Sequence, residues 1–176
     1  MQNPAVRINT SLRLRSNSGS PGKPPLLLQK DEKMDNKYEA LRLRNQLCFP
    51  LYAASREVVK KYTPYLDKLG LTYTQYITMM VLWEEQEISV KSLGEKLFLD
   101  SGTLTPLLKV LEKKGLVSRT RSTADERVLV VSATPEGMQL RDVALDVPPS
   151  VGSCINISQE DAAALYRILY KILGRE

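Results

Sequence analysis

The clearest pattern of hydrophobic and polar positions lies between residues 97 and 134. Apolar residues recur there at intervals of three and four, which places them on one face of a helix: Leu104, Leu107, Leu108 and Leu111. The other face carries short hydroxyl groups, lysines and a proline in about the first turn: Thr103, Thr105, Pro106, Lys109 and Lys113. The pattern predicts an amphipathic helix that begins at Asp100 and ends before Gly115.

The residues that follow this helix alternate between apolar and polar side chains, as strands do. Residues 116–121 and 128–131 are predicted to pair as a hairpin, and residues 122–126 form its tip. Helix and hairpin together favour a recognition helix followed by a wing at about 116–133.

A second short helix is predicted just before the recognition helix, over residues 88–97. Ser89 can cap its first turn, and its apolar side consists of Val90, Leu93 and Leu97. Two short helices joined by a tight turn are the helix-turn-helix arrangement, here at about 88–114.

The segment before this unit is also predicted to be helical. Residues 37–65 have the pattern of a long helix, which Pro50 should kink, and a turn follows at Gly70. Thr72 and Gln75 have the spacing of a capping box that opens the next helix. The inward positions of that helix are predicted to be Ile77, Met80, Val81 and Trp83.

Two helices are predicted after the hairpin. One begins at Thr134 and Pro135, runs to about residue 147 and stops at the two prolines that follow. Ser158 caps the last helix, whose apolar stripe is Leu165, Ile168, Leu169, Ile172 and Leu173. Such a stripe at the end of a chain favours pairing with a second subunit; packing against the chain's own first helix is the alternative.

The first 33 residues differ in composition from the rest. They are rich in Pro, Ser, Gly and Arg, which predicts a disordered basic extension, with the domain proper at 34–176. A basic arm that touches DNA phosphates is the functional alternative for this extension. The expected fold is therefore mainly α: a winged helix-turn-helix with N- and C-terminal dimerisation helices, the latter at 134–176, and a small β wing.

Charge favours an anionic partner. The formal net charge is +5 and the sequence pI is about 9.2. Residues 105–127 hold six basic residues against three acidic ones. A merely solvated charged face is the alternative to a DNA-binding surface. No apolar run of about 18 residues exists, so no membrane partner is expected.

Several kinds of chemistry are excluded by composition. Histidine is absent, which removes imidazole bases, Ser-His-Asp triads and histidine metal sites. Two cysteines are too few for a four-ligand zinc centre, so no metal and no cofactor are expected. We therefore expect a binding protein rather than an enzyme.

One cysteine has neighbours that suit redox chemistry. Tyr52 follows Cys48 by one helical turn and Tyr62 by about four, while Arg44 and Arg56 flank the position with positive charge. Phenol hydroxyls and guanidinium groups stabilise a thiolate, which is the species that attacks a peroxide. An inert buried cysteine is the alternative.

The second cysteine, Cys154, falls in a predicted loop over residues 148–157. A mobile loop suits a resolving thiol, although an incidental loop cysteine has the same composition.

Four segments resemble one known family: NQLCFPLYAASRE, LGLTYTQY, LGEKLFLDSGTLTPLLKVLEKKGLVSRTR and ADERVLVVSAT. They are similar to the MarR family of winged-helix regulators, and within it to the organic-hydroperoxide-responsive, thiol-based branch. The resemblance runs from about Leu41 to the end of the chain. It implies a cytoplasmic bacterial homodimer that binds a pseudo-palindromic operator in double-stranded DNA.

The resemblance also implies roles for particular residues. Cys48 would be the redox sensor, hydrogen-bonded across the dimer by Tyr52 and Tyr62. Cys154 would be its disulfide partner; a small thiol that caps Cys48 is the alternative.

For DNA binding, the resemblance implies that four residues of the recognition helix would face the major groove: Ser101, Thr103, Thr105 and Lys109. Arg127 would reach the minor groove, with Asp125 supporting the wing. Further DNA contacts are expected from Lys113, Arg119 and Arg121.

The expected function is a repressor that releases its operator when an organic hydroperoxide oxidises Cys48. Three alternatives remain open from the sequence. One is a MarR-type regulator that responds to a small ligand, and another is a thiol-based global or virulence regulator. The third is a thiol peroxidase, which leaves the basic helix and wing unexplained.

Overall fold

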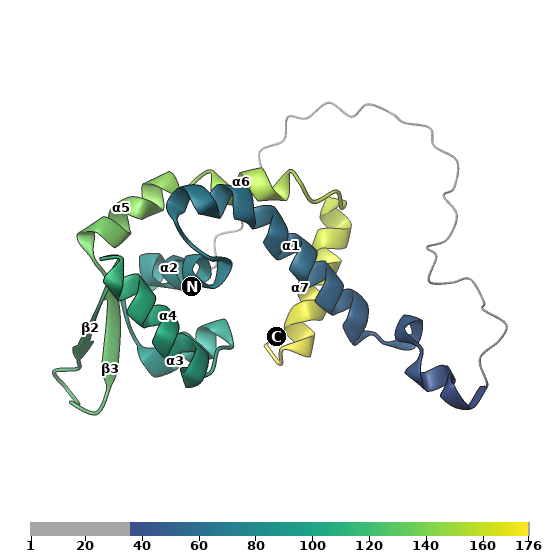
Figure 1. The fold of residues 1–176 in the computed structure, drawn as a ribbon, viewed down its shortest axis with the longest axis horizontal. Coiled ribbons are helices and arrows are strands. Elements are labelled where there is room, and N and C mark those ends of the chain that lie inside the picture. The colour runs from purple at the N-terminus through teal and green to yellow at the C-terminus, as the bar shows by residue number, and fades with distance from the viewer. Residues whose placement is uncertain (1–35, 176) are drawn as a thin grey trace. The chain divides into compact units, whose positions relative to one another are not determined.

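The computed structural model describes residues 36–175 (Figure 1), and the chain divides into two compact units between Phe49 and Pro50. Within the first unit lie two short 3-10 helices, η2 (Asn36–Leu41) and η3 (Leu43–Asn45). The side-chain amide of Asn45 donates to the carbonyl of Glu39 at 2.7 Å. The predicted disordered extension at 1–33 lies outside the described residues.

The long first helix begins later than predicted. Helix α1 spans Cys48–Leu69, and residues 37–45, expected to be α-helical, are largely 3-10 helix instead. Pro50 consequently lies in the first turn of α1, where a proline has no helical hydrogen bond to lose. The predicted kink is wrong for that reason. The turn at Gly70 is confirmed, with a positive φ of 63° after the end of α1.

Helix α2 (Tyr73–Glu85) opens with the predicted capping box. The backbone N–H of Gln75 donates to the Thr72 hydroxyl at 3.4 Å, and the N–H of Thr72 donates to the Gln75 side-chain oxygen at 3.1 Å. Of the four positions predicted to face inward, Met80 is exposed, whereas Ile77, Val81 and Trp83 are partly buried against the core. The buried apolar residues of α2 are Tyr76, Met79 and Leu82.

The helix-turn-helix consists of α3 (Val90–Leu97) and α4 (Ser101–Lys113). Ser89 caps α3 as predicted, and its hydroxyl accepts from the N–H of Ser92 at 3.0 Å. Ile88, expected inside the helix, belongs to a strand that sequence analysis missed, β1 (Glu87–Ser89). A strand of three residues is too short to show an alternating pattern.

The predicted hairpin is confirmed by β2 (Val117–Arg121) and β3 (Leu129–Ala133). The sheet is antiparallel in the order β1-β3-β2, and Val131 pairs with both Ile88 and Arg119. The β2–β3 hairpin projects from the helices (Figure 1). Because β1 pairs with β3, the wing is tied directly to the start of α3.

The chain ends with three helices rather than two: α5 (Pro135–Val143), α6 (Val147–Gly152) and α7 (Gln159–Ile172). Thr134 and Ser158 cap α5 and α7 as predicted. The two prolines after Val147 do not stop a helix but lie in the first turn of α6, where proline is tolerated.

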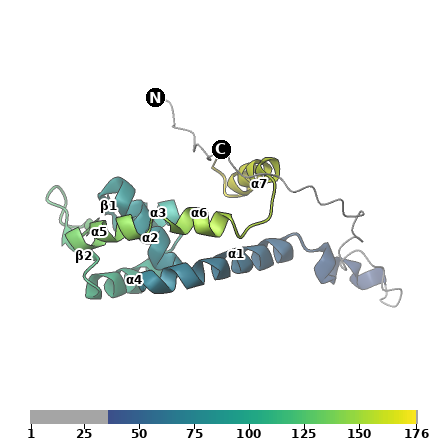
Figure 2. The ribbon, with the colours of Figure 1, turned by 90° about the horizontal axis from the view of Figure 1, so that it is seen from above.

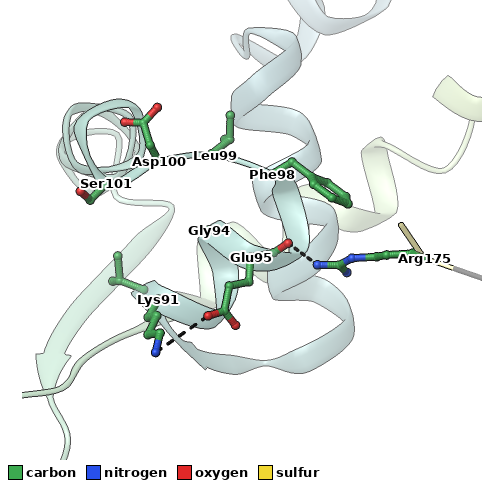
Figure 3. Close-up of a pocket in the computed structure, with 9 residues that line it drawn as sticks. Lys91, Gly94, Glu95, Phe98, Leu99, Asp100, Ser101 and Arg175 are labelled. Atoms are coloured by element: carbon green, nitrogen blue, oxygen red, sulfur yellow. Dashed lines mark hydrogen bonds and ion pairs between the residues drawn. The ribbon is translucent and has the colours of Figure 1, made fainter. Parts of the chain in front are cut away.

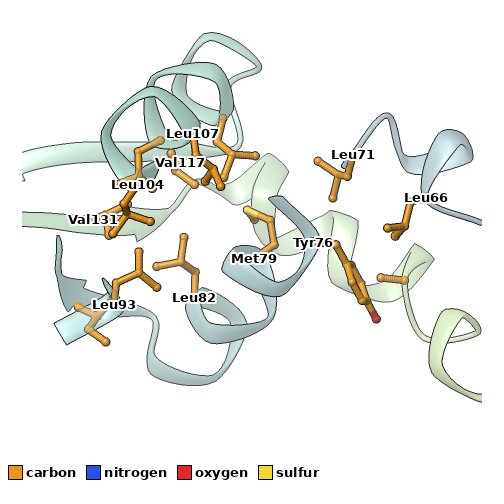
Figure 4. Packing of buried hydrophobic residues seen from close by; sticks show 14 of the residues in the cluster. Leu66, Leu71, Tyr76, Met79, Leu82, Leu93, Leu104, Leu107, Val117 and Val131 are labelled. Atoms are coloured by element: carbon orange, nitrogen blue, oxygen red, sulfur yellow. The ribbon is translucent and has the colours of Figure 1, made fainter. Parts of the chain in front are cut away.

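The core lies between the helix-turn-helix, α2 and the sheet (Figure 4). All four predicted leucines of α4 are buried, and they pack in one cluster with Leu82, Leu93 and Val131. Helices α1 and α7 lie at the edge of this compact part (Figure 2): α1 buries Leu66 alone, and α7 buries no residue. The mainly helical fold with a small three-stranded sheet confirms the predicted winged helix-turn-helix.

Candidate nucleic-acid interface and thiol site

The start of α4 is fixed by Asp100. Its carboxylate accepts from the backbone N–H of Thr103 at 2.9 Å and from the Thr103 hydroxyl at 3.0 Å. These hydrogen bonds hold the pKa of Asp100 below its ordinary value. The first turn of α4 is thus set by an ionised cap, which also suits the positive end of the helix dipole.

The face of α4 opposite the buried leucines is exposed. It presents the residues predicted to contact the major groove, namely Ser101, Thr103, Thr105, Lys109 and Lys113. Pro106 lies in the second turn rather than the first, inside the helix. A proline there has no N–H to donate to the carbonyl of Gly102. The exposed face can therefore offer hydroxyl groups and lysines to a partner.

The tip of the wing is organised by hydrogen bonds to its own backbone. The Arg121 guanidinium donates to the carbonyl of Glu126 at 3.0 Å, and the N–H of Arg127 donates to the Asp125 carboxylate at 2.9 Å. Asp125 thus supports the turn through the backbone of Arg127. The side chains of Arg121 and Arg127 remain exposed at the tip.

Arg119, predicted to contact DNA, is engaged within the protein. Its guanidinium forms an ion pair with Glu112 of α4 through two nitrogens, with Nε at 3.1 Å from the carboxylate. The pair holds the pKa of Glu112 below its ordinary value. Only 18% of the Arg119 side chain is exposed, so this ion pair fastens the wing to the recognition helix.

The turn between α3 and α4 has an unusual residue in it. Phe98 is half exposed and has a positive φ of 54°, a conformation that is uncommon for a bulky side chain. The guanidinium of Arg175 lies 4.5 Å from the centre of the Phe98 ring and donates to the carbonyl of Glu95 at 2.5 Å (Figure 3). Arg175, just after α7, therefore contacts the turn that precedes the recognition helix.

Both cysteines are free and exposed. Cys48 is the first residue of α1, not a mid-helix residue as predicted. Cys154 lies just after α6, in a connection shorter than the loop predicted from residue 148 onward. Both sulfurs are accessible to a small oxidant.

The two tyrosines predicted to bind the sensor thiol have different surroundings. Tyr52 is exposed, and its hydroxyl accepts from Arg56 at 3.1 Å. The ring of Tyr62 meets that of Tyr73 edge-on at 4.9 Å, and partial burial raises the pKa of Tyr62. Their relation to Cys48 stays a prediction.

Sequence reasoning missed a neighbour of the second cysteine. The hydroxyl of Tyr65 lies 4.0 Å from the sulfur of Cys154, and this contact raises the pKa of Tyr65. The Cys154 thiol also donates to the carbonyl of Ser150 at 3.4 Å. Tyr65 and Cys154 lie 89 positions apart in the chain, so no local spacing signals their contact.

In residues 36–175 no helix is long and apolar enough to cross a membrane. The same described range holds no group of three acidic or cysteine side chains arranged to bind a metal ion.

Comparison with known proteins gives a consistent picture. Residues 60–143 match a protein-family model described as transcriptional regulator SarA/Rot. The organic hydroperoxide resistance transcriptional regulator of Bacillus subtilis is 48% identical over 140 residues, which are 80% of this chain and 95% of that protein. The HTH-type transcriptional regulator SarZ of Staphylococcus epidermidis is 48% identical over 133 residues, 76% of this chain and 90% of SarZ.

Solved structures of AbfR, a protein of Staphylococcus epidermidis, are similar to this chain. Overoxidised AbfR bound to DNA is 37% identical, with a TM-score of 0.64 over 78% of this chain and 97% of that one. Reduced AbfR bound to DNA has the same identity and TM-score, and a disulfide form of AbfR has a TM-score of 0.53. The B. subtilis protein and SarZ are named as transcriptional regulators rather than enzymes.

Proposed function

Because the chain belongs to the MarR family of winged-helix transcriptional regulators, we propose that it is a redox-responsive repressor. It binds DNA as a homodimer while Cys48 is reduced, and it releases DNA after an organic hydroperoxide oxidises Cys48. It acts in the bacterial cytoplasm, where the DNA is. One observation carries the proposal: both cysteines are free and exposed, in a chain 37% identical to a protein solved on DNA in reduced and overoxidised states.

Dimerisation is supported by the apolar residues that a single chain leaves uncovered. In α7 and its C-cap, four aliphatic side chains are about half exposed: Leu165, Ile168, Ile172 and Leu173. Tyr166 in the same helix is 64% exposed. A contiguous apolar surface of this kind marks a protein interface, and a twofold dimer would cover it with a second copy of the same surface.

DNA binding is supported by the exposed face of α4 and the tip of the wing. Thr105 and Lys109 would reach base edges in the major groove, while Lys113 and Arg121 contact phosphates. Arg127 would enter the minor groove beside them. Two such units in a dimer match two half-sites one helical turn apart, so the operator is pseudo-palindromic.

The redox step begins with the Cys48 thiolate. It attacks the terminal oxygen of the hydroperoxide, a sulfur–oxygen bond forms, and the oxygen–oxygen bond breaks. The departing alkoxide takes up a proton and leaves as an alcohol, so the peroxide is reduced while sulfur becomes a sulfenic acid. The Cys154 thiolate of the partner subunit then attacks that sulfur, forming a disulfide and releasing hydroxide, which is protonated to water.

Helix geometry supports a sensor site shared between subunits. Cys48 and Tyr62 lie in one continuous helix, 14 positions apart. At about 1.5 Å per residue they are separated by about 21 Å along its axis, too far for a hydrogen bond within one chain. A Tyr62 hydroxyl that donates to the Cys48 sulfur must therefore come from the partner subunit.

The test measures DNA release and disulfide formation on three proteins. In the wild type, cumene hydroperoxide should lower affinity for a duplex that the reduced protein selects from a random-sequence pool. It should also give a dimer band on non-reducing electrophoresis. Cys48→Ser should bind the same duplex and keep it after oxidation. Release by Cys48→Ser would refute the sensor role of Cys48 and favour the alternative of a small-ligand regulator.

Cys154→Ser is the matched control, because it removes the other exposed thiol and leaves the sensor. It should lose the dimer band while Cys48 is still oxidised. A persistent band in this variant would refute the pairing of Cys48 with Cys154.

A second candidate is a thiol-based regulator without a dedicated peroxide-detoxifying target. The match of residues 60–143 to the SarA/Rot model favours it, as does the 48% identity to SarZ. Mapping the genomic sites bound by the reduced protein separates the two candidates. Sites confined to genes for peroxide-reducing enzymes support the dedicated repressor, and broadly distributed sites support the second candidate.

A further inference from the structure

Lys114 joins the C-terminal ends of two helices. Its ammonium group donates to the carbonyl of Gly70, just after α1, at 2.5 Å, and to the side-chain oxygen of Gln75 at 3.1 Å. Lys114 itself is the residue that caps α4. Both helices stop at a glycine with positive φ, 63° at Gly70 and 73° at Gly115. Lys114 therefore binds the end of α1 from the end of the recognition helix.

The surroundings of Lys114 suit a fixed cation. The last carbonyls of a helix carry partial negative charge, so an ammonium group at the end of α1 is stabilised by the helix dipole. Gln75 is 8% exposed and also accepts from the N–H of Thr72. Because one oxygen serves both the capping box and Lys114, the contact is part of the α1–α2 junction.

This junction matters because α1 packs on the core toward its Gly70 end, where Tyr62, Tyr65 and Leu69 are partly buried. Of its 22 residues only Leu66 is buried, and Leu66 lies in the last turn of the helix. Leu71, directly after the Gly70 turn, is buried as well. Along α1 the end near Gly70 is thus the part that is anchored in the core. A rotation or shift of α1 reaches the recognition helix through this end.

We propose that Lys114 is a positioning residue that couples α1 to the recognition helix α4. This inference rests on the proposed function, in which oxidation acts at Cys48, the first residue of α1. Helix α1 connects Cys48 to the Gly70 turn and contains Pro64, so a displacement that starts at Cys48 reaches Gly70 through a helix that lacks one backbone hydrogen bond. Lys114 holds the carbonyl at that end and moves α4 with it.

The test separates oxidation from its effect on DNA. Lys114→Met removes the ammonium group and keeps most of the side-chain length. Three quantities are measured: the rate at which cumene hydroperoxide consumes the Cys48 thiol, and the affinities of the reduced and the oxidised protein for the selected duplex. The thiol should react at the wild-type rate, while the ratio of reduced to oxidised affinity should fall about 3- to 30-fold.

Two further variants serve as controls. Lys113→Met removes the same charge one position earlier, from a side chain that is exposed, as that of Lys114 is, and that is proposed to contact phosphate. It should weaken binding in both redox states and keep the affinity ratio of the wild type. Gln75→Glu retains an acceptor for Lys114 and adds a negative charge, so it should keep or increase the ratio. If Lys114→Met forms no dimer in light scattering, Lys114→Gln is used instead, because the glutamine side chain is too short to reach Gly70.

The outcomes distinguish this proposal from the function on which it rests. If the wild-type protein releases DNA on oxidation and Lys114→Met keeps the same ratio of reduced to oxidised affinity, the coupling role alone is overturned. A wild type that holds DNA equally before and after oxidation overturns the redox function, and the coupling role with it.

Discussion

Replacement of Ile168 by alanine tests whether α7 is a dimer interface. Ile168 has 49% of its surface exposed in the single chain. Complete burial of an isoleucine is worth about 1.5–3 kcal/mol, so covering the exposed half contributes about 1 kcal/mol. A twofold interface contains each residue twice, and the change therefore removes about 2 kcal/mol per dimer. The dimer dissociation constant should rise about 30-fold.

The measurement is sedimentation velocity over a concentration series, with far-UV circular dichroism to verify that α7 stays helical. Alanine has the highest helix propensity, so the substitution does not weaken the helix itself. Arg167→Ala is the matched control, because it truncates an exposed neighbour outside the apolar stripe. Equal dissociation constants for Ile168→Ala, Arg167→Ala and the wild type would refute the assignment of α7 to the interface.

Three other changes have defined expected results. Arg127→Ala should weaken binding of the selected duplex and reduce the slope of log affinity against log salt by about 2 per dimer, and an unchanged slope in a salt titration would exclude a phosphate or minor-groove contact. Leu111→Ala, at a position with 0% exposure, should lower the free energy of unfolding by about 2–5 kcal/mol in urea denaturation, whereas a loss near zero would contradict its place in the core. The lowered pKa of Asp100 means that its ionised form stabilises the folded state; this contribution is present above the ordinary value of 3.8 and is lost as pH falls through the lower folded pKa. Asp100→Asn keeps a capping oxygen but does not titrate, so the difference in stability between wild type and variant should shrink in acid, and a constant difference would refute the assignment.

Much of the fold could be predicted from the sequence because its signals are local. The four leucines of α4 specify one buried face by spacing alone, and the caps at Thr72, Ser89 and Ser158 mark where helices begin. The hairpin was predicted from the alternation on either side of its tip. These features depend on neighbours within a few positions, which a single sequence displays directly.

Several wrong predictions concern prolines, whose effect on a helix depends on their position within it. Proline was expected to break helices, yet Pro50 lies in a first turn, and Pro148 and Pro149 begin a helix. Pro106 lies inside α4, one turn later than predicted. A proline in the sequence shows only that one backbone N–H is missing. Whether its absence removes a helical hydrogen bond depends on where the helix starts, and the sequence predicts that start only to within a few residues.

The site was less predictable than the fold, because its contacts join distant segments. Arg119 was assigned to DNA from its charge, but its partner Glu112 lies across the turn from α4 to β2. Lys114 has the same charge as Lys113 in the sequence, and only the fold reveals that it binds Gly70, 44 positions away. Composition therefore does not separate basic residues with contacts inside the protein, such as Arg119 and Lys114, from those proposed to contact DNA.

The proposed sensor adds a further step, because Cys48 and Tyr62, which are assigned to it, are far apart within one chain. The 21 Å that helix geometry puts between Cys48 and Tyr62, about 1.5 Å for each of 14 residues, cannot be closed inside a continuous α1. The apolar surface left exposed on α7 calls for the same second copy that could supply the phenol. Dimerisation and sensing would then share one assembly: an oxidant that changes how Cys48 meets the partner's tyrosines also changes how the two subunits sit together. Under the proposed function, the spacing between the two recognition helices would follow from that arrangement. Oxidation of Cys48 would then change the affinity for a two-part operator without altering a residue that contacts DNA.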